Sequence, residues 1–80
     1  MVAVAKKSKS TSVLDGSKLK SARILRGLTQ VQLAAAIGVH PISISQYERE
    51  AVEPSLAAAR RLAMALGVPI EELLVAPSSE

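Results

Sequence analysis

The chain has 80 residues, enough for one small domain, and it contains no cysteine, which excludes a disulfide framework and a thiolate zinc site. No apolar run is long enough for a secretory signal or a membrane span, so we expect a soluble cytoplasmic protein. The net charge of +3 is uneven, because residues 1–20 carry five lysines and one aspartate whereas residues 41–80 carry three arginines and six glutamates.

Residues 1–15 are rich in lysine and serine and show no periodicity, so we expect a flexible basic arm there. Its charge suits an anionic partner such as DNA, although a solvated tail that contacts nothing would carry the same charge. A membrane partner is not expected, because the lysines lie on no amphipathic helix. Residues 76–80 are expected to form a disordered tail, which leaves residues 16–75 as the folded domain.

The predicted domain is all-α, because aromatic residues are nearly absent and β-branched residues do not alternate with polar ones. Thr29 and Gln32 have the spacing of a reciprocal capping box, Gly38 can end the same helix in a left-handed turn, and Pro41 suits the first position of the next helix. Signals of this kind divide the chain into five predicted helices, at residues 17–26, 29–37, 41–48, 55–67 and 69–74.

The joint between the second and third predicted helices is the most distinctive feature of the sequence. It covers only residues 38–40, so the two helices must cross steeply, and Ala34 is small enough to stand where they meet. Ile44 and Tyr47 share the inner face of the third helix, which leaves its polar side outward. A helix held in this way fits the major groove of DNA, which is about 12 Å wide.

A set of short motifs recurs at characteristic spacing along the chain, on both sides of the joint. The motifs are Leu28-Thr29-Gln30, Leu33-Ala34, Ile37-Gly38-Val39, Ile44-Ser45, Glu48, Pro54-Ser55-Leu56, Leu62-Ala63, Leu66-Gly67-Val68 and Glu72-Leu73. Over residues 17–75 the sequence resembles the Cro and phage-repressor (Xre-like) helix-turn-helix domains. The resemblance implies a compact five-helix, lambda-repressor-like domain that binds double-stranded DNA at a two-fold operator as a homodimer. It implies a transcriptional repressor or, alternatively, the antitoxin of a toxin–antitoxin pair whose main partner is a protein toxin.

The resemblance also implies a set of DNA-contacting positions. Gln30 stands where the family contacts a backbone phosphate, at the start of a helix. Gln46 is the strongest base reader, because an amide can pair bidentately with adenine, and Ile42 can meet a thymine methyl. Ser43 and Ser45 contact either bases or phosphate, and both alternatives stay open. The remaining candidates are His40, Pro41 and Arg49 together with the arm lysines Lys6, Lys7 and Lys9.

Other positions are expected to be structural. Arg23 and Glu48 match a family ion pair that ties the first helix to the end of the third, which we favour over two independent surface charges. His40 is the only histidine, and we expect a cap or a phosphate contact rather than a metal ligand. No metal site, cofactor or catalytic triad is expected, so the chain is not predicted to be an enzyme. The candidate dimer interface, part of which can belong to the core, comprises Ile70, Leu73, Leu74 and Val75.

The sequence departs from the family pattern at three places. His40 replaces the usual serine or threonine cap of the third helix, and Glu50 replaces the glycine that normally follows it. The loop at residues 50–53 also lacks the lysines and arginines that the family often places against phosphate. We expect the N-terminal lysines to compensate as an arm along the duplex.

Overall fold

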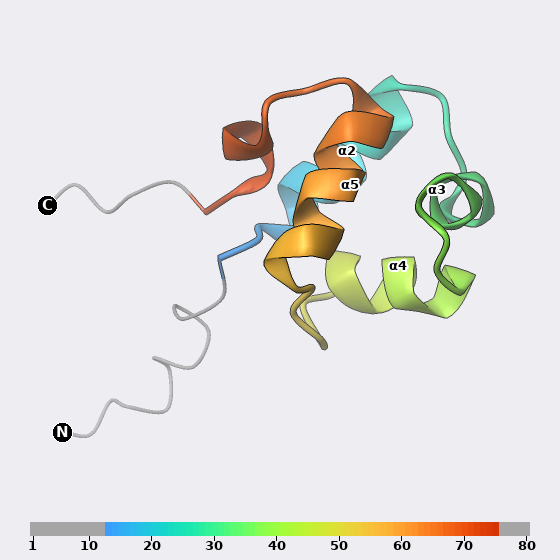
Figure 1. Ribbon diagram of the computed structural model, residues 1–80, viewed down its shortest axis with the longest axis horizontal. Helices are drawn as coiled ribbons and strands as arrows, with labels where there is room; N and C mark the ends of the chain where they lie inside the picture. The colour runs from blue at the N-terminus through green and yellow to red at the C-terminus, as the bar shows by residue number, and fades with distance from the viewer. Residues whose placement is uncertain (1–12, 76–80) are drawn as a thin grey trace, which may run out of the picture.

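The computed structural model describes residues 13–75, and in this range the chain forms four α-helices and one 3-10 turn (Figure 1). The helices are α2 (Gly16–Leu25), α3 (Gln30–Ile37), α4 (Pro41–Glu48) and α5 (Leu56–Leu66), and the 3-10 turn is η1 (Ile70–Leu73). The prediction of an all-α domain is confirmed for the described residues. None of these helices has the length and apolar character that crossing a membrane requires.

Local capping interactions set the bounds of the helices. The capping box of α3 is present, because Thr29 Oγ1 accepts from the amide of Gln32 at 3.0 Å and Gln32 Oε1 accepts from the amide of Thr29 at 2.9 Å. Ser55 caps α5 by a single bond, in which its Oγ accepts from the amide of Ala58 at 3.0 Å. Gly38 ends α3 with a φ of 76°, a left-handed conformation that glycine adopts without steric cost.

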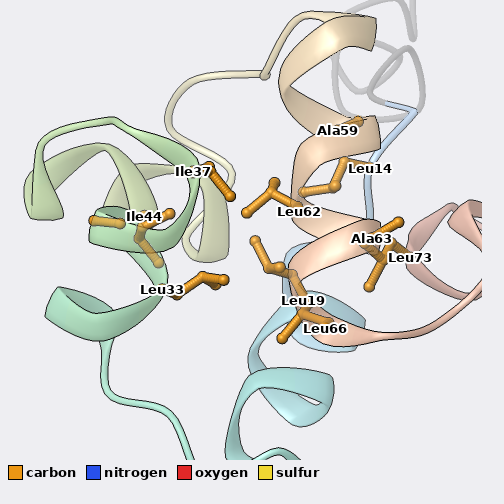
Figure 2. Close-up of a cluster of buried hydrophobic side chains, with 11 residues drawn as sticks. Leu14, Leu19, Leu33, Ile37, Ile44, Ala59, Leu62, Ala63, Leu66 and Leu73 are labelled. Carbon is orange, nitrogen blue, oxygen red and sulfur yellow. The ribbon is translucent and has the colours of Figure 1, made fainter.

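The hydrophobic core lies where α5 meets the other helices (Figure 2). Leu62 of α5 lies toward Leu33 and Ile37 of α3, whereas Leu66 lies beside Leu19 of α2. Each fully buried leucine stabilises the fold by about 1.5–3 kcal/mol relative to an exposed one. The fully buried large side chains come from every element of the described fold: Leu19, Leu33, Ile44, Leu62 and Leu73.

The predicted fifth α-helix at residues 69–74 is wrong in type and length. The chain forms only the four-residue 3-10 turn η1, and Leu74 is already extended, with a φ of −93° and a ψ of 156°. Leu74 is extended because it pairs with Leu14 in an isolated antiparallel bridge. A helix cannot continue through a residue that pairs in this way, so tertiary pairing ends it.

The predicted boundary of the N-terminal arm is wrong by three residues, because residues 13–15 belong to the folded domain. Leu14 is only 2% exposed, and Val13 accepts through its carbonyl oxygen from the amide of Val75 at 2.8 Å. Asp15 is the N-cap of α2, where its Oδ1 accepts from the amides of Ser17 and Lys18 at 3.0 and 3.3 Å. Residues 1–12 and 76–80, and with them Lys6, Lys7 and Lys9, lie outside the described residues.

Candidate nucleic-acid interface

The turn between α3 and α4 places His40 at the start of α4. His40 Nδ1 accepts from the amide of Ile42 at 3.1 Å, which makes its imidazole the side-chain cap of α4. Pro41 follows at the first helical position, where its missing N–H leaves no bond unmade. The expected cap is therefore present, although the residue differs from the usual serine or threonine.

Helix α4 has an inner and an outer side. Ile44 is fully buried, whereas the Ile42 side chain is 55% exposed. Ser43 and Gln46 are partly exposed, and their side chains make no hydrogen bond within residues 13–75. These three side chains are therefore free to contact a ligand without first breaking an intramolecular bond.

Ser45 and Arg49 form a pair at the C-terminal end of α4. Arg49 Nε donates to Ser45 Oγ at 3.3 Å, one helical turn away. The bond uses the Nε edge of the guanidinium and leaves both Nη groups unbonded among the described residues. The pair thus leaves a planar cationic group with free donors at the C-terminal end of α4.

The predicted ion pair between α2 and the end of α4 is present. Arg23 Nε donates to Glu48 Oε2 at 2.6 Å, and Arg23 Nη2 donates to Glu48 Oε1 at 3.2 Å. The two side chains are only 10% and 4% exposed. Arg23 Nη1 also donates to the carbonyl oxygen of Leu28 at 2.9 Å, so the same guanidinium holds the loop between α2 and α3.

Gln30 takes part in this network rather than projecting freely from α3. Its Nε2 donates to Glu48 Oε1 at 3.0 Å. The family resemblance implied a phosphate contact at this position, but the structure places the side-chain amide on a buried carboxylate. The Gln30 side chain therefore braces the first turn of α3 against the last residue of α4, and only its backbone amide stands at the helix start that favours anions.

The loop after α4 contains two glutamates, Glu50 and Glu53, whose hydrogen-bonding role the sequence did not reveal. Glu50 has a φ of 61°, in the left-handed region, and its Oε2 accepts from the amide of Gly16 at 2.8 Å. Glu53 Oε2 accepts from the amide of Val13 at 2.8 Å. The loop that lacks phosphate-binding cations therefore binds the segment at residues 13–16. The only sequence signal was Glu50 at a position where glycine is usual.

The C-terminal end is divided between core and surface. Leu73 is fully buried, so its assignment to a dimer interface is wrong, because a side chain inside the core cannot contact a partner. Ile70 and Leu74 are partly buried, and Val75 is 44% exposed. Ile70 and Leu74 line an apolar groove of about 400 Å³, which also includes Val13, Leu14, Glu53, Pro54, Leu56, Ala59 and Arg60.

The described part of the chain shows no cluster of three or more histidine, aspartate or glutamate side chains that could hold a metal ion. The polar groups that stand out are instead the outer side of α4, the Ser45–Arg49 pair and the Arg23–Gln30–Glu48 network behind them. The arrangement is that of a surface helix supported from behind by a buried ion pair.

Comparison with known proteins identifies the same architecture. The sequence model of the Helix-turn-helix family matches residues 19–73. The uncharacterized HTH-type transcriptional regulator MJ0272 of Methanocaldococcus jannaschii is 38% identical over 64 residues, which cover 80% of this chain and 97% of that protein. The cryptic phage CTXphi transcriptional repressor RstR of Vibrio cholerae is 38% identical over 58 residues, which cover 72% of this chain and 52% of RstR.

A solved structure shows the same fold. The restriction-modification controller protein C.AhdI from Aeromonas hydrophila superposes on this chain with a TM-score of 0.69 and 32% sequence identity. The match covers 71% of this chain and 86% of C.AhdI. These relatives confirm the family resemblance that the motif spacing predicted.

Proposed function

The chain belongs to the helix-turn-helix family of transcriptional regulators, and we propose that it is a repressor that places α4 in the major groove of a two-fold operator. The observation that carries the proposal is the division of α4 into two sides. Ile44 and the ion pair of Glu48 fix the inner side, whereas Ile42 and Gln46 on the outer side are free. A helix of about 10–12 Å diameter fits the major groove, about 12 Å wide.

Each outer side chain has a distinct role in this proposal. Gln46 pairs with an adenine edge, because its amide offers one donor and one acceptor, and Ile42 contacts a thymine methyl. Ser43 lies on the same side and adds a hydroxyl that both donates and accepts. His40 and Pro41 bring the start of α4 close to the duplex, where the first residues of a reading helix contact bases.

Phosphate contacts come from the ends of the motif. Arg49 binds a backbone phosphate through its two Nη groups while Ser45 holds its Nε. The backbone amide of Gln30 faces a second phosphate at the start of α3. Lys6, Lys7 and Lys9, which lie outside the described residues, add charge along the backbone. Such contacts position the protein without reading sequence.

We further infer that two copies associate through the apolar groove. A monomer of this size has little core, and a groove lined by Leu56, Ile70 and Leu74 exposes apolar surface that a second copy can cover. Association of this kind would present two reading helices to a two-fold operator. Val75 stands beside the groove and is 44% exposed, so it joins the same interface.

The test is selection of duplex DNA from a random library, followed by measurement of the dissociation constant for the enriched site. Gln46→Ala should weaken specific binding by about 1–3 kcal/mol and relax preference at one base pair, while non-specific binding stays nearly unchanged. Met64→Ala is the matched control, because Met64 is 80% exposed on α5 and lies outside α3 and α4. Failure to enrich any sequence would overturn the proposed function. An equal loss of specific and non-specific binding would remove Gln46 from the base-reading set.

A further inference from the structure

A second hollow, of about 460 Å³, lies between α3 and α5 and includes no residue of α4. The ends of α2 and α5 that border it lie at the top of Figure 1, whereas α4 lies at the bottom. This α3–α5 hollow is therefore separate from the proposed DNA-reading surface. Its lining is apolar apart from two arginines, and includes Leu28, Ala36, Met64 and Ala65 beside Arg26 and Arg61.

Met64 gives the hollow an apolar contact surface that the fold itself does not use. Its side chain is 80% exposed, although the neighbouring residues Leu62 and Ala63 of α5 are buried. Covering an exposed apolar side chain of this size is favourable, and methionine adapts its shape to what covers it. The apolar lining therefore favours a ligand that brings apolar side chains of its own.

The two arginines give the hollow a positive charge that nothing in residues 13–75 neutralises. Neither Arg26 nor Arg61 has a hydrogen-bond or ion-pair partner there. Arg26 is held at the C-terminal end of α5, where the helix dipole favours a cation, because a Cβ atom on Gly67 would lie 2.9 Å from Arg26 Nη1. Arg61 and Met64 are three residues apart on α5 and share one face of it. A ligand that covers Met64 therefore meets a guanidinium group as well.

We propose that the α3–α5 hollow binds an amphipathic helix of a partner protein, whose apolar side chains cover Met64 and whose carboxylates pair with Arg26 and Arg61. The inference goes beyond DNA binding and does not depend on it. Both α3 and α5 bond their backbone groups within the helix, so the hollow offers no sheet edge to an extended segment. A helix can present apolar and acidic side chains together on one face, at spacings of three and four residues.

Three other occupants fit the hollow less well. A second copy cannot supply such a helix, because α2, α3 and α5 contain no acidic residue and Glu48 of α4 is buried in its ion pair. DNA phosphates match the charge but offer no apolar surface to Met64. A small carboxylic acid needs a pocket that encloses most of it, whereas Arg61 and Met64 are both exposed.

The test is selection from a phage-displayed library of helical peptides with the full chain as the immobilised target. The enriched peptides should carry glutamate or aspartate beside an apolar stripe. Arg61→Glu should weaken binding of an enriched peptide about ten-fold, and Met64→Ala should weaken it about three- to ten-fold. Replacing the carboxylates of the peptide by lysine should restore its binding to Arg61→Glu, which also shows that this variant is folded. Lys20→Glu is the matched control, because it makes the same charge change on an exposed residue that lines no groove, and it should change binding less than about two-fold.

Enrichment of no peptide, enrichment of basic peptides, or equal effects of Arg61→Glu and Lys20→Glu would overturn the inference while the proposed function stands. Two parallel measurements separate the other occupants. If Arg61→Glu weakens operator binding more than Lys20→Glu does, the hollow contacts DNA and the inference is wrong. If sedimentation shows self-association that Arg61→Glu abolishes and Lys20→Glu retains, a second copy occupies the hollow, which also overturns the inference. A chain that selects acidic peptides but no DNA sequence would overturn the proposed function and leave the inference standing.

Discussion

Replacement of Glu48 by alanine should destabilise the domain severely. Glu48 receives three hydrogen bonds, two from Arg23 at 2.6 and 3.2 Å and one from Gln30 at 3.0 Å. With Arg23 only 10% and Glu48 only 4% exposed, water cannot replace the lost carboxylate. The substitution leaves the guanidinium and the Gln30 amide without their acceptor at the place where α2, α3 and α4 meet.

The expected loss of unfolding free energy follows from the burial of the Arg23–Glu48 pair. Removing one partner of a buried ion pair costs about 3–5 kcal/mol, whereas an exposed pair contributes about 0–1 kcal/mol. A domain of this size has a free energy of unfolding of about 5 kcal/mol, so Glu48→Ala should leave it barely folded. Arg23→Met combined with Glu48→Leu should recover much of the loss, because an apolar pair needs no desolvation. The recovery will be incomplete, since Arg23 Nη1 also holds the carbonyl oxygen of Leu28.

The assay is a double-mutant cycle at positions 23 and 48, read by urea unfolding under circular dichroism. Glu48→Gln serves as the matched variant, because it keeps the side-chain shape and one acceptor oxygen, while it removes the charge and replaces the second acceptor by an N–H donor. It should lose less stability than Glu48→Ala. A coupling energy below about 0.5 kcal/mol would show that the two residues act independently and would refute the argument from burial.

Three further predictions concern the segments that close the domain. The hydrogen bond from the Ser17 side chain, with the amides of Lys18 and Ser17, lowers the pKa of Asp15 below its ordinary 3.8. The stability that this cap contributes should therefore be fully present above about pH 4 and be lost as the pH falls through the lowered pKa. In urea unfolding at pH 7, Asp15→Ala should lower the free energy of unfolding by about 0.5–2 kcal/mol. This loss should become smaller in acid, because the carboxylate of the wild-type cap is then protonated. A loss that does not change with pH would exclude the charged cap. Glu50→Ala should be less stable than Glu50→Gly by about 1 kcal/mol. Both variants lose the bond to Gly16, and only glycine adopts the φ of 61° without strain. The opposite order of melting temperatures would show that the backbone at position 50 is not strained. Leu73→Ala should cost about 2–5 kcal/mol, since Leu73 is 0% exposed, and a loss below about 1 kcal/mol would contradict its place in the core.

Local signals were sufficient for the central helices. The capping box of Thr29 and Gln32, the glycine at position 38 and the proline at position 41 act within one turn of the residues they affect, so their outcome depends little on the rest of the chain. The Arg23–Glu48 pair was also predicted, but from the family resemblance rather than from local chemistry. The spacing of 25 residues between the partners carries no signal of its own.

The two ends of the domain were predicted less well, because long-range pairing decides them. Leu14 looked like part of a polar arm, but it is 2% exposed, packs in the core cluster and pairs with Leu74. That same bridge stops the last helix after one 3-10 turn, in which side chains recur every third residue rather than every 3.6. Leu73 could face the core in either kind of helix, since residues three apart share a face in both, and the position that changes is Leu74, which is extended.

One departure from the family pattern, Glu50, is coupled to the start of α2. Several bonds hold the left-handed backbone of Glu50: its amide donates to the carbonyl oxygen of Tyr47 at 3.1 Å, and its carboxylate accepts from the amide of Gly16. Gly16 in turn must lack a side chain, since a Cβ atom would overlap the end of α4. Asp15 then caps α2 from the adjacent position. Substitutions at these positions are therefore coupled. Glycine at position 50 removes the backbone strain and also the hydrogen bond to the amide of Gly16. Its net effect on stability therefore depends on how residues 13–16 pack in the same protein.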